Sequence, residues 1–74
     1  MTLKELRPGD QARVTKIAAT GALKRRIMDM GLTKGCELTV RKLAPLGDPM
    51  EINLRGYELT LRKQECDAIQ VEKI

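Results

Sequence analysis

Apolar and polar residues alternate strictly from residue 50 to residue 61, on both sides of Arg55-Gly56. A period of two is typical of a β-strand with one face in the core and the other in water. We therefore predict two strands joined by a two-residue turn. Directly opposed residues of a hairpin share one face of the sheet, and a slip of one residue would separate them. All six apolar side chains face inward together when the pairs are Leu54–Tyr57, Ile52–Leu59 and Met50–Leu61.

The same alternation recurs over shorter stretches. Residues 11–17 and 36–43 each predict a strand, and in both the pattern is interrupted toward the end, which is typical of a β-bulge or a bend. Residues 68–74 predict a last short strand, and the polar residues 63–67 before it predict a tight helical turn. Residues 2–6 predict another helical turn, with both of its leucines inward.

One segment has helical periodicity. Its apolar residues recur at i, i+4 and i+7, as Leu23, Ile27 and Met30. Thr20 is a suitable N-cap, and Gly31 can take the left-handed conformation that ends a helix. These signals predict a helix over residues 21–30, between the first and second strands.

The sum predicts a mainly β protein, a small five-stranded SH3-like barrel with an inserted α-helix between the first and second strands. Short strands with bulges favour a barrel because closure pairs the edges of a small sheet. The chain has 74 residues, of which 42% are hydrophobic and 32% charged. This composition predicts one globular domain over residues 1–74 with a small core.

Composition also bears on location and metals. No apolar run approaches the roughly 20 residues of a membrane span, and the first residues lack the apolar core of a signal peptide, so we expect a cytoplasmic protein.

Cys36 continues the inward pattern of its strand and is predicted to be buried. Cys66 lies among charged residues and is predicted to be a more accessible thiol. With two isolated cysteines and no histidine, we expect no metal site and no cofactor.

Nothing in the sequence predicts an enzyme. A nucleophile needs a base beside it, and the chain has no histidine. The carboxylates Glu37, Glu51 and Glu58 fall on outward strand faces beside basic residues. No glycine-rich phosphate-binding motif is present.

Nucleic-acid binding is the alternative function, because the net charge is +4 and small barrels bind nucleic acids. The 14 basic residues are, however, interleaved with 10 acidic ones, and the only basic run is Lys24-Arg25-Arg26. The single aromatic residue, Tyr57, is predicted to face inward, where it cannot stack on a base. Attraction to lipid needs about four or more clustered charges, so we expect membrane proximity only through a protein partner.

Two places suit a protein partner. Met28 lies opposite the apolar stripe of the helix, flanked by Lys24 and Arg25; alternatively, it packs under the N-terminal leucines. The prolines and glycine of residues 45–49 stiffen a loop whose tip is Leu46; alternatively, Leu46 caps the barrel. A stiff loop loses less entropy on binding. The predicted partner-binding residues are Lys24, Arg25, Met28, Pro45 and Leu46.

Two stretches resemble the FeoA family of bacterial ferrous iron uptake: R-R-I-M-D-M-G-L-T-K-G-C-E-L-T-V at residues 25–40, and A-P-L-G-D-P-M-E-I-N-L-R-G-Y-E-L-T-L-R at residues 44–62. Lys34 stands where family members often have proline. The resemblance implies an SH3-like barrel, a cytoplasmic location and no catalytic activity. It also implies a partner, FeoB, the ferrous iron transporter with a cytoplasmic GTP-binding domain. The implied function is an accessory or regulatory protein that docks on FeoB. Self-association through edge strands is a third possibility.

Overall fold

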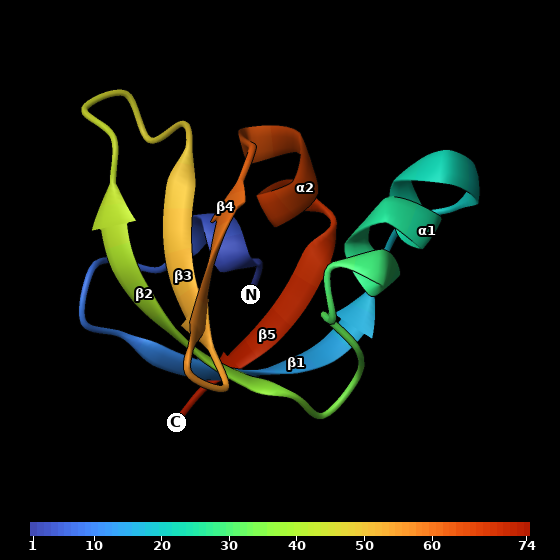
Figure 1. Cartoon of the computed structure of the whole chain (residues 1–74), viewed down its shortest axis with the longest axis horizontal. Coiled ribbons are helices and arrows are strands. Elements are labelled where there is room, and N and C mark those ends of the chain that lie inside the picture. Colours follow the sequence, from blue (N-terminus) through green and yellow to red (C-terminus); the bar gives the residue numbers. More distant parts are fainter.

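A computed structural model describes residues 1–74 as a five-stranded antiparallel sheet that bends around the core, with three helical segments (Figure 1). The sheet order is β4-β3-β2-β1-β5. The elements are η1 (Leu3–Glu5), β1 (Gln11–Ile17), α1 (Gly21–Asp29), β2 (Glu37–Leu43), β3 (Met50–Leu54), β4 (Tyr57–Leu61), α2 (Lys63–Asp67) and β5 (Ile69–Lys73). Each predicted element is present, with ends that differ from the prediction by at most one residue.

The sheet is open, whereas the short strands had predicted a closed barrel. β4 and β5 form its two edges and do not pair with each other. The edge of β5 is instead occupied by the N-terminal segment, because Thr2 forms a bridge with Gln70 and the Val71 amide donates to the Met1 carbonyl at 2.8 Å. Pairing with the N-terminal segment satisfies backbone N–H and C=O groups at the edge of β5, as closing the sheet into a barrel would. β4 and β5 therefore need not pair with each other.

The β3–β4 hairpin has the predicted register, with Leu54 opposite Tyr57 and Met50 opposite Leu61. Arg55 and Gly56 both have positive φ, 52° and 91°. Two such residues form a type I′ turn, whose twist matches that of the strands it joins. The register therefore follows from the shared apolar face of the two strands, although Arg-Gly is a weak turn signal.

Tyr57 lies on the predicted face of β4, opposite Leu54, but it is 49% exposed and so is not part of the core. Burial increases along β4, from exposed Tyr57 through half-buried Leu59 to fully buried Leu61. The cause is the open sheet. β4 has a neighbouring strand on one side only, so the start of its inner face stays accessible to water.

Both interruptions of the alternation are bulges. The register of β1 against β5 shifts between Val14 and Lys16, and that of β2 against β3 shifts between Val40 and Lys42. An extra residue in one strand increases its local bend and twist. These two bulges lie where a sheet of five short strands has to curve around its core.

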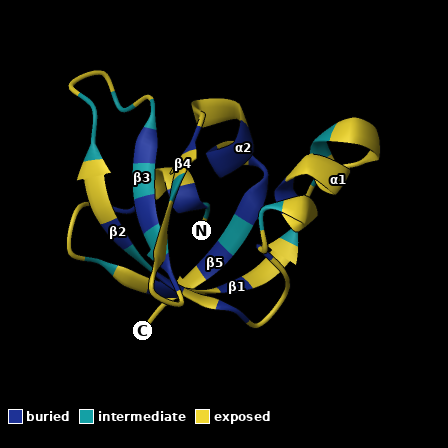
Figure 2. Ribbon diagram, in the orientation of Figure 1, coloured by how far each residue is buried: buried dark blue, intermediate teal, exposed yellow.

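The core contains 17 buried apolar residues, mostly from the strands (Figure 2). Cys36 is buried as predicted, but the prediction of an accessible Cys66 was wrong. Cys66 lies on the inner side of α2, where its Sγ is 4.0 Å from the sulfur of Met50. Burial, followed by the nearby charge of Glu65, raises the pKa of the Cys66 thiol to about 12. Of the two charged neighbours in sequence, Asp67 is exposed but Glu65 is itself buried, so charge beside Cys66 did not indicate where the thiol points.

The inserted helix α1 projects from the sheet at the end of β1 (Figure 1). Ile27 is its fully buried residue, and Leu23 and Met30 are half-buried, so the predicted stripe does face the core. Gly31 has the predicted left-handed φ, 94°. Thr20 stands at the N-cap, but its side chain forms no capping hydrogen bond.

Candidate protein-binding surfaces

The face of α1 that points away from the core carries three of the five predicted binding residues. Gly21, Lys24, Arg25 and Met28 follow the spacing i, i+3, i+4 and i+7, which places them on one side of a helix. Together with Asp29 they line a shallow hollow. We call these five residues the outer face of α1. Met28 is 46% exposed, so it is not packed under the N-terminal leucines, which instead lie with α2 and β5.

Arg26 holds α1 to the rest of the protein. Its Nε atom lies 3.0 Å from Oε2 of Glu65, whose side chain is only 4% exposed. The other carboxylate oxygen of Glu65 accepts a hydrogen bond from the Arg62 amide at 2.8 Å. A carboxylate out of water needs such partners, so Glu65 both caps α2 and anchors α1. Lys24 and Arg25 form no ion pair.

The loop at residues 44–49 is the second candidate. Its Leu46 is 93% exposed, so this side chain stands at the tip and does not cap the sheet. The loop is held by hydrogen bonds from Gly47 N to Ala44 O at 2.7 Å and from Ala44 N to Pro49 O at 3.1 Å. Asp48 in turn accepts the Lys63 amide at 3.0 Å. These bonds give an apolar tip a fixed position in solvent.

The two candidates do not form one surface. In Figure 1 the loop between β2 and β3 stands at the upper left, while α1 lies at the right edge of the molecule. Lys24, Arg25 and Met28 are thus brought together, and Pro45 and Leu46 lie apart from them.

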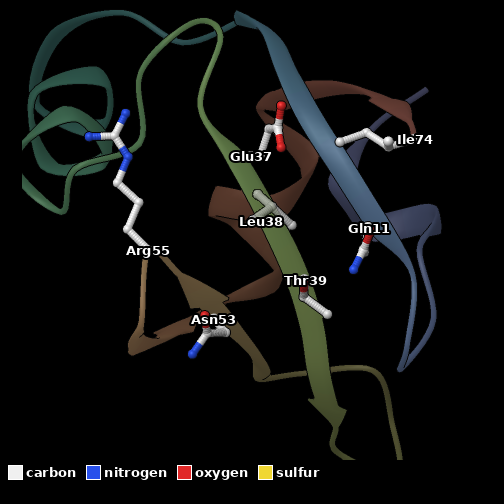
Figure 3. Close-up of a pocket in the computed structure, with 7 residues that line it drawn as sticks. All are labelled: Gln11, Glu37, Leu38, Thr39, Asn53, Arg55 and Ile74. Atoms are coloured by element: carbon white, nitrogen blue, oxygen red, sulfur yellow. The ribbon is translucent and has the colours of Figure 1, made fainter.

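A third feature was not foreseen from the sequence. A hollow of about 150 Å³ lies on the outer side of the sheet (Figure 3), lined by Gln11, Glu37, Leu38, Thr39, Asn53, Arg55 and Ile74. The alternation did mark Asn53 and Thr39 as residues off the core face. Their meeting depends on the β2–β3 pairing, which places Thr39 opposite Asn53. The acidic side chain of this hollow, Glu37, is 3.0 Å from Arg13 and is therefore paired.

Nowhere do three His, Cys, Asp or Glu side chains gather in a way that could hold a metal ion. No helix is long and apolar enough to cross a membrane. The carboxylates Glu37 and Glu58 form surface ion pairs, with Arg13 and Arg41. The expectation of a protein without catalytic or metal chemistry stays a prediction.

Comparison with known proteins identifies the family to which this chain belongs. Residues 1–73 match the FeoA domain family model. The whole chain is 38% identical to part of an Fe(2+) transport protein A/Fe(2+) transporter FeoB fusion protein of Porphyromonas gingivalis, of which it spans only 9%.

Solved structures of FeoA proteins have the same fold as this chain. FeoA of Chlorobium tepidum is 49% identical, with a TM-score of 0.89 over 100% of this chain and 70% of that one. A zinc complex of FeoA from Stenotrophomonas maltophilia, described as a prokaryotic SH3 domain protein, is 29% identical, with a TM-score of 0.83 over 97% of this chain and 89% of that one. The open five-stranded sheet is thus an SH3-like fold, and the chain belongs to the FeoA family.

Proposed function

We propose that this protein is an accessory or regulatory protein of ferrous iron uptake, which acts in the cytoplasm by docking on FeoB or on its GTP-binding domain. The observation that carries the proposal is the fusion protein, in which a domain 38% identical to this chain is joined to FeoB. Joining two modules keeps each at a high effective concentration near the other. Such a fusion supports association of the separate proteins.

Docking can regulate transport without chemistry. A ligand shifts a conformational equilibrium only by as much as its affinities for the two states differ. The protein would therefore bind one state of the transporter cycle more tightly than another. Its own residues would supply recognition, with no catalytic role for any of them.

Two measurements test the proposal. The purified protein should be retained by the cytoplasmic domain of FeoB from the same organism in at least one nucleotide state. Deletion of its gene should alter ferrous iron uptake. If no nucleotide state gives binding and uptake is unchanged, the proposal is wrong.

Nucleic-acid binding is the second candidate, on the single observation of a net charge of +4. It predicts a gel shift that weakens steeply as salt is added, because bound phosphates release counterions. The absence of a gel shift at low salt would rule out nucleic-acid binding.

A further inference from the structure

We propose that the outer face of α1 binds an acidic segment of a partner protein, with an apolar side chain of that segment seated on Met28. This inference rests on the proposed function and specifies the chemistry of the docking site. Three properties of the outer face of α1 support the proposal: its positive charge, the exposure of Met28, and the contacts that hold the helix in place.

The charge at the start of α1 is positive and uncompensated. Lys24 and Arg25 are exposed and form no ion pair, and no acidic residue lies in the first turn. The unpaired amide groups at a helix start carry a partial positive charge. Here the Thr20 side chain leaves them uncapped. Asp29 is the one acidic residue of the face, and it lies at the far end. Carboxylates of a partner would therefore sit toward Lys24 and Arg25.

Met28 supplies the apolar part. It lies one turn beyond Lys24 and Arg25 in the same hollow, 46% exposed. Methionine is unbranched and polarizable, so it adapts to side chains of different shape. Specific protein–protein interfaces usually combine an apolar centre with a rim of complementary charges.

The helix presents this face in a fixed orientation. Ile27 is buried on one side, and Arg26 is held by the buried carboxylate of Glu65 at 3.0 Å. These two neighbours in sequence set how α1 is rotated about its axis. The outer face is then turned to solvent before any partner arrives, which lowers the entropy lost on binding.

A second copy of this chain does not fit as the occupant, because few of its carboxylates are free. Six of the ten acidic residues form ion pairs: Asp10, Glu37, Glu58, Glu65, Asp67 and Glu72. Glu5 and Asp48 accept backbone amides instead. A lipid surface is disfavoured because it needs about four or more clustered basic residues. On the proposed function of docking on a protein, the occupant is therefore a segment of another protein, and a gel shift with nucleic acid that the Lys24→Glu/Arg25→Glu variant loses would overturn this assignment.

The test measures binding of the full chain to detergent-solubilised FeoB from the same organism. The Lys24→Glu/Arg25→Glu variant should bind about tenfold more weakly, and about 0.3 M salt should weaken the wild type toward the variant. The matched control is Lys42→Glu/Lys63→Glu, which makes the same change in charge beside the loop at residues 44–49. It should bind within about twofold of the wild type.

Met28 is tested separately. Met28→Ala should weaken binding about threefold to tenfold, and Met28→Leu should restore most of the loss, because the contact is apolar. Circular dichroism checks that each variant is folded.

The outcomes separate the two proposals. If FeoB binds the wild type and Lys24→Glu/Arg25→Glu equally, the α1 inference is wrong while the docking function stands. An equal loss in the control variant also overturns the inference, because the effect would then not be specific to the outer face of α1. If FeoB does not bind the wild type in any nucleotide state, the docking that both proposals require is absent.

Discussion

The sheet and α1 are stabilised in different ways. In the sheet, β3 lies between two neighbours, and its residues Met50, Ile52 and Leu54 are all fully buried. Along α1 only Ile27 is fully buried, and the helix projects into solvent (Figure 2). Besides the half-buried Leu23 and Met30, three contacts hold the helix: the buried Ile27 side chain, the Arg26–Glu65 ion pair and the approach of Tyr57 to Gly31.

This difference indicates a division of roles. Elements with few buried contacts open at lower free energy than a core does, and binding elements are often of this kind. The sheet determines whether the protein folds, whereas the contacts of α1 determine how its outer face is presented. The following variants test that division, from the largest expected effect on stability to the smallest.

The largest effect should come from the sheet. Ile52→Ala removes a fully buried side chain and should lower the free energy of unfolding by about 2–5 kcal/mol, measured by urea denaturation. Leu59→Ala is the matched variant in the edge strand. Because Leu59 is only half-buried, its loss should be about half as large. Equal losses would mean that the inner face of β4 is as closed as that of β3.

Gly31→Ala tests the end of α1. At a φ of 94° an alanine is strained by about 1–2 kcal/mol. Its Cβ would also lie 2.9 Å from the Tyr57 hydroxyl, so Tyr57 has to move. Gly9→Ala is the control, since Gly9 has the same φ with nothing within 4 Å. A greater loss of stability at Gly31 than at Gly9 measures the Tyr57 contact, and equal losses would show that this contact contributes nothing.

Arg26→Gln tests the ion pair. It leaves the Glu65 carboxylate with the Arg62 amide but without its cation, and should destabilise by about 1 kcal/mol, because Arg26 itself is largely exposed. Hydrogen exchange should become faster in α1 while the amides of β3 stay protected. Faster exchange throughout the sheet would contradict the division between the two regions.

The smallest effects should come from the exposed apolar residues. Met28→Asp and Leu46→Asp should each change stability by no more than about 0.5 kcal/mol, as is usual for surface positions. If either variant unfolds the domain, that residue belongs to the core. Because α1 and the loop between β2 and β3 lie on opposite sides of the molecule (Figure 1), comparing FeoB binding of the two variants also shows which of the two surfaces docks.

Much of the fold followed from local patterns. The hairpin register, both bulges and the helix end at Gly31 could be predicted because each depends on a few neighbouring residues. The exposure of Tyr57 and the burial of Cys66 could not be predicted, because both depend on elements that are distant in sequence. Tyr57 is exposed because no strand pairs with the free edge of β4. Cys66 is buried because α2 turns it toward Met50.

The candidate site divides in the same way. Helical spacing alone placed Lys24, Arg25 and Met28 on one face, and turn chemistry alone placed Leu46 at a loop tip. Only the tertiary structure decided that these places are far apart and that Glu65 holds Arg26. The sequence by itself determined which residues share a face, since that depends on the geometry of one element. Which elements meet depends on how the whole chain packs, and this decided the open sheet, the buried thiol and the anchored helix.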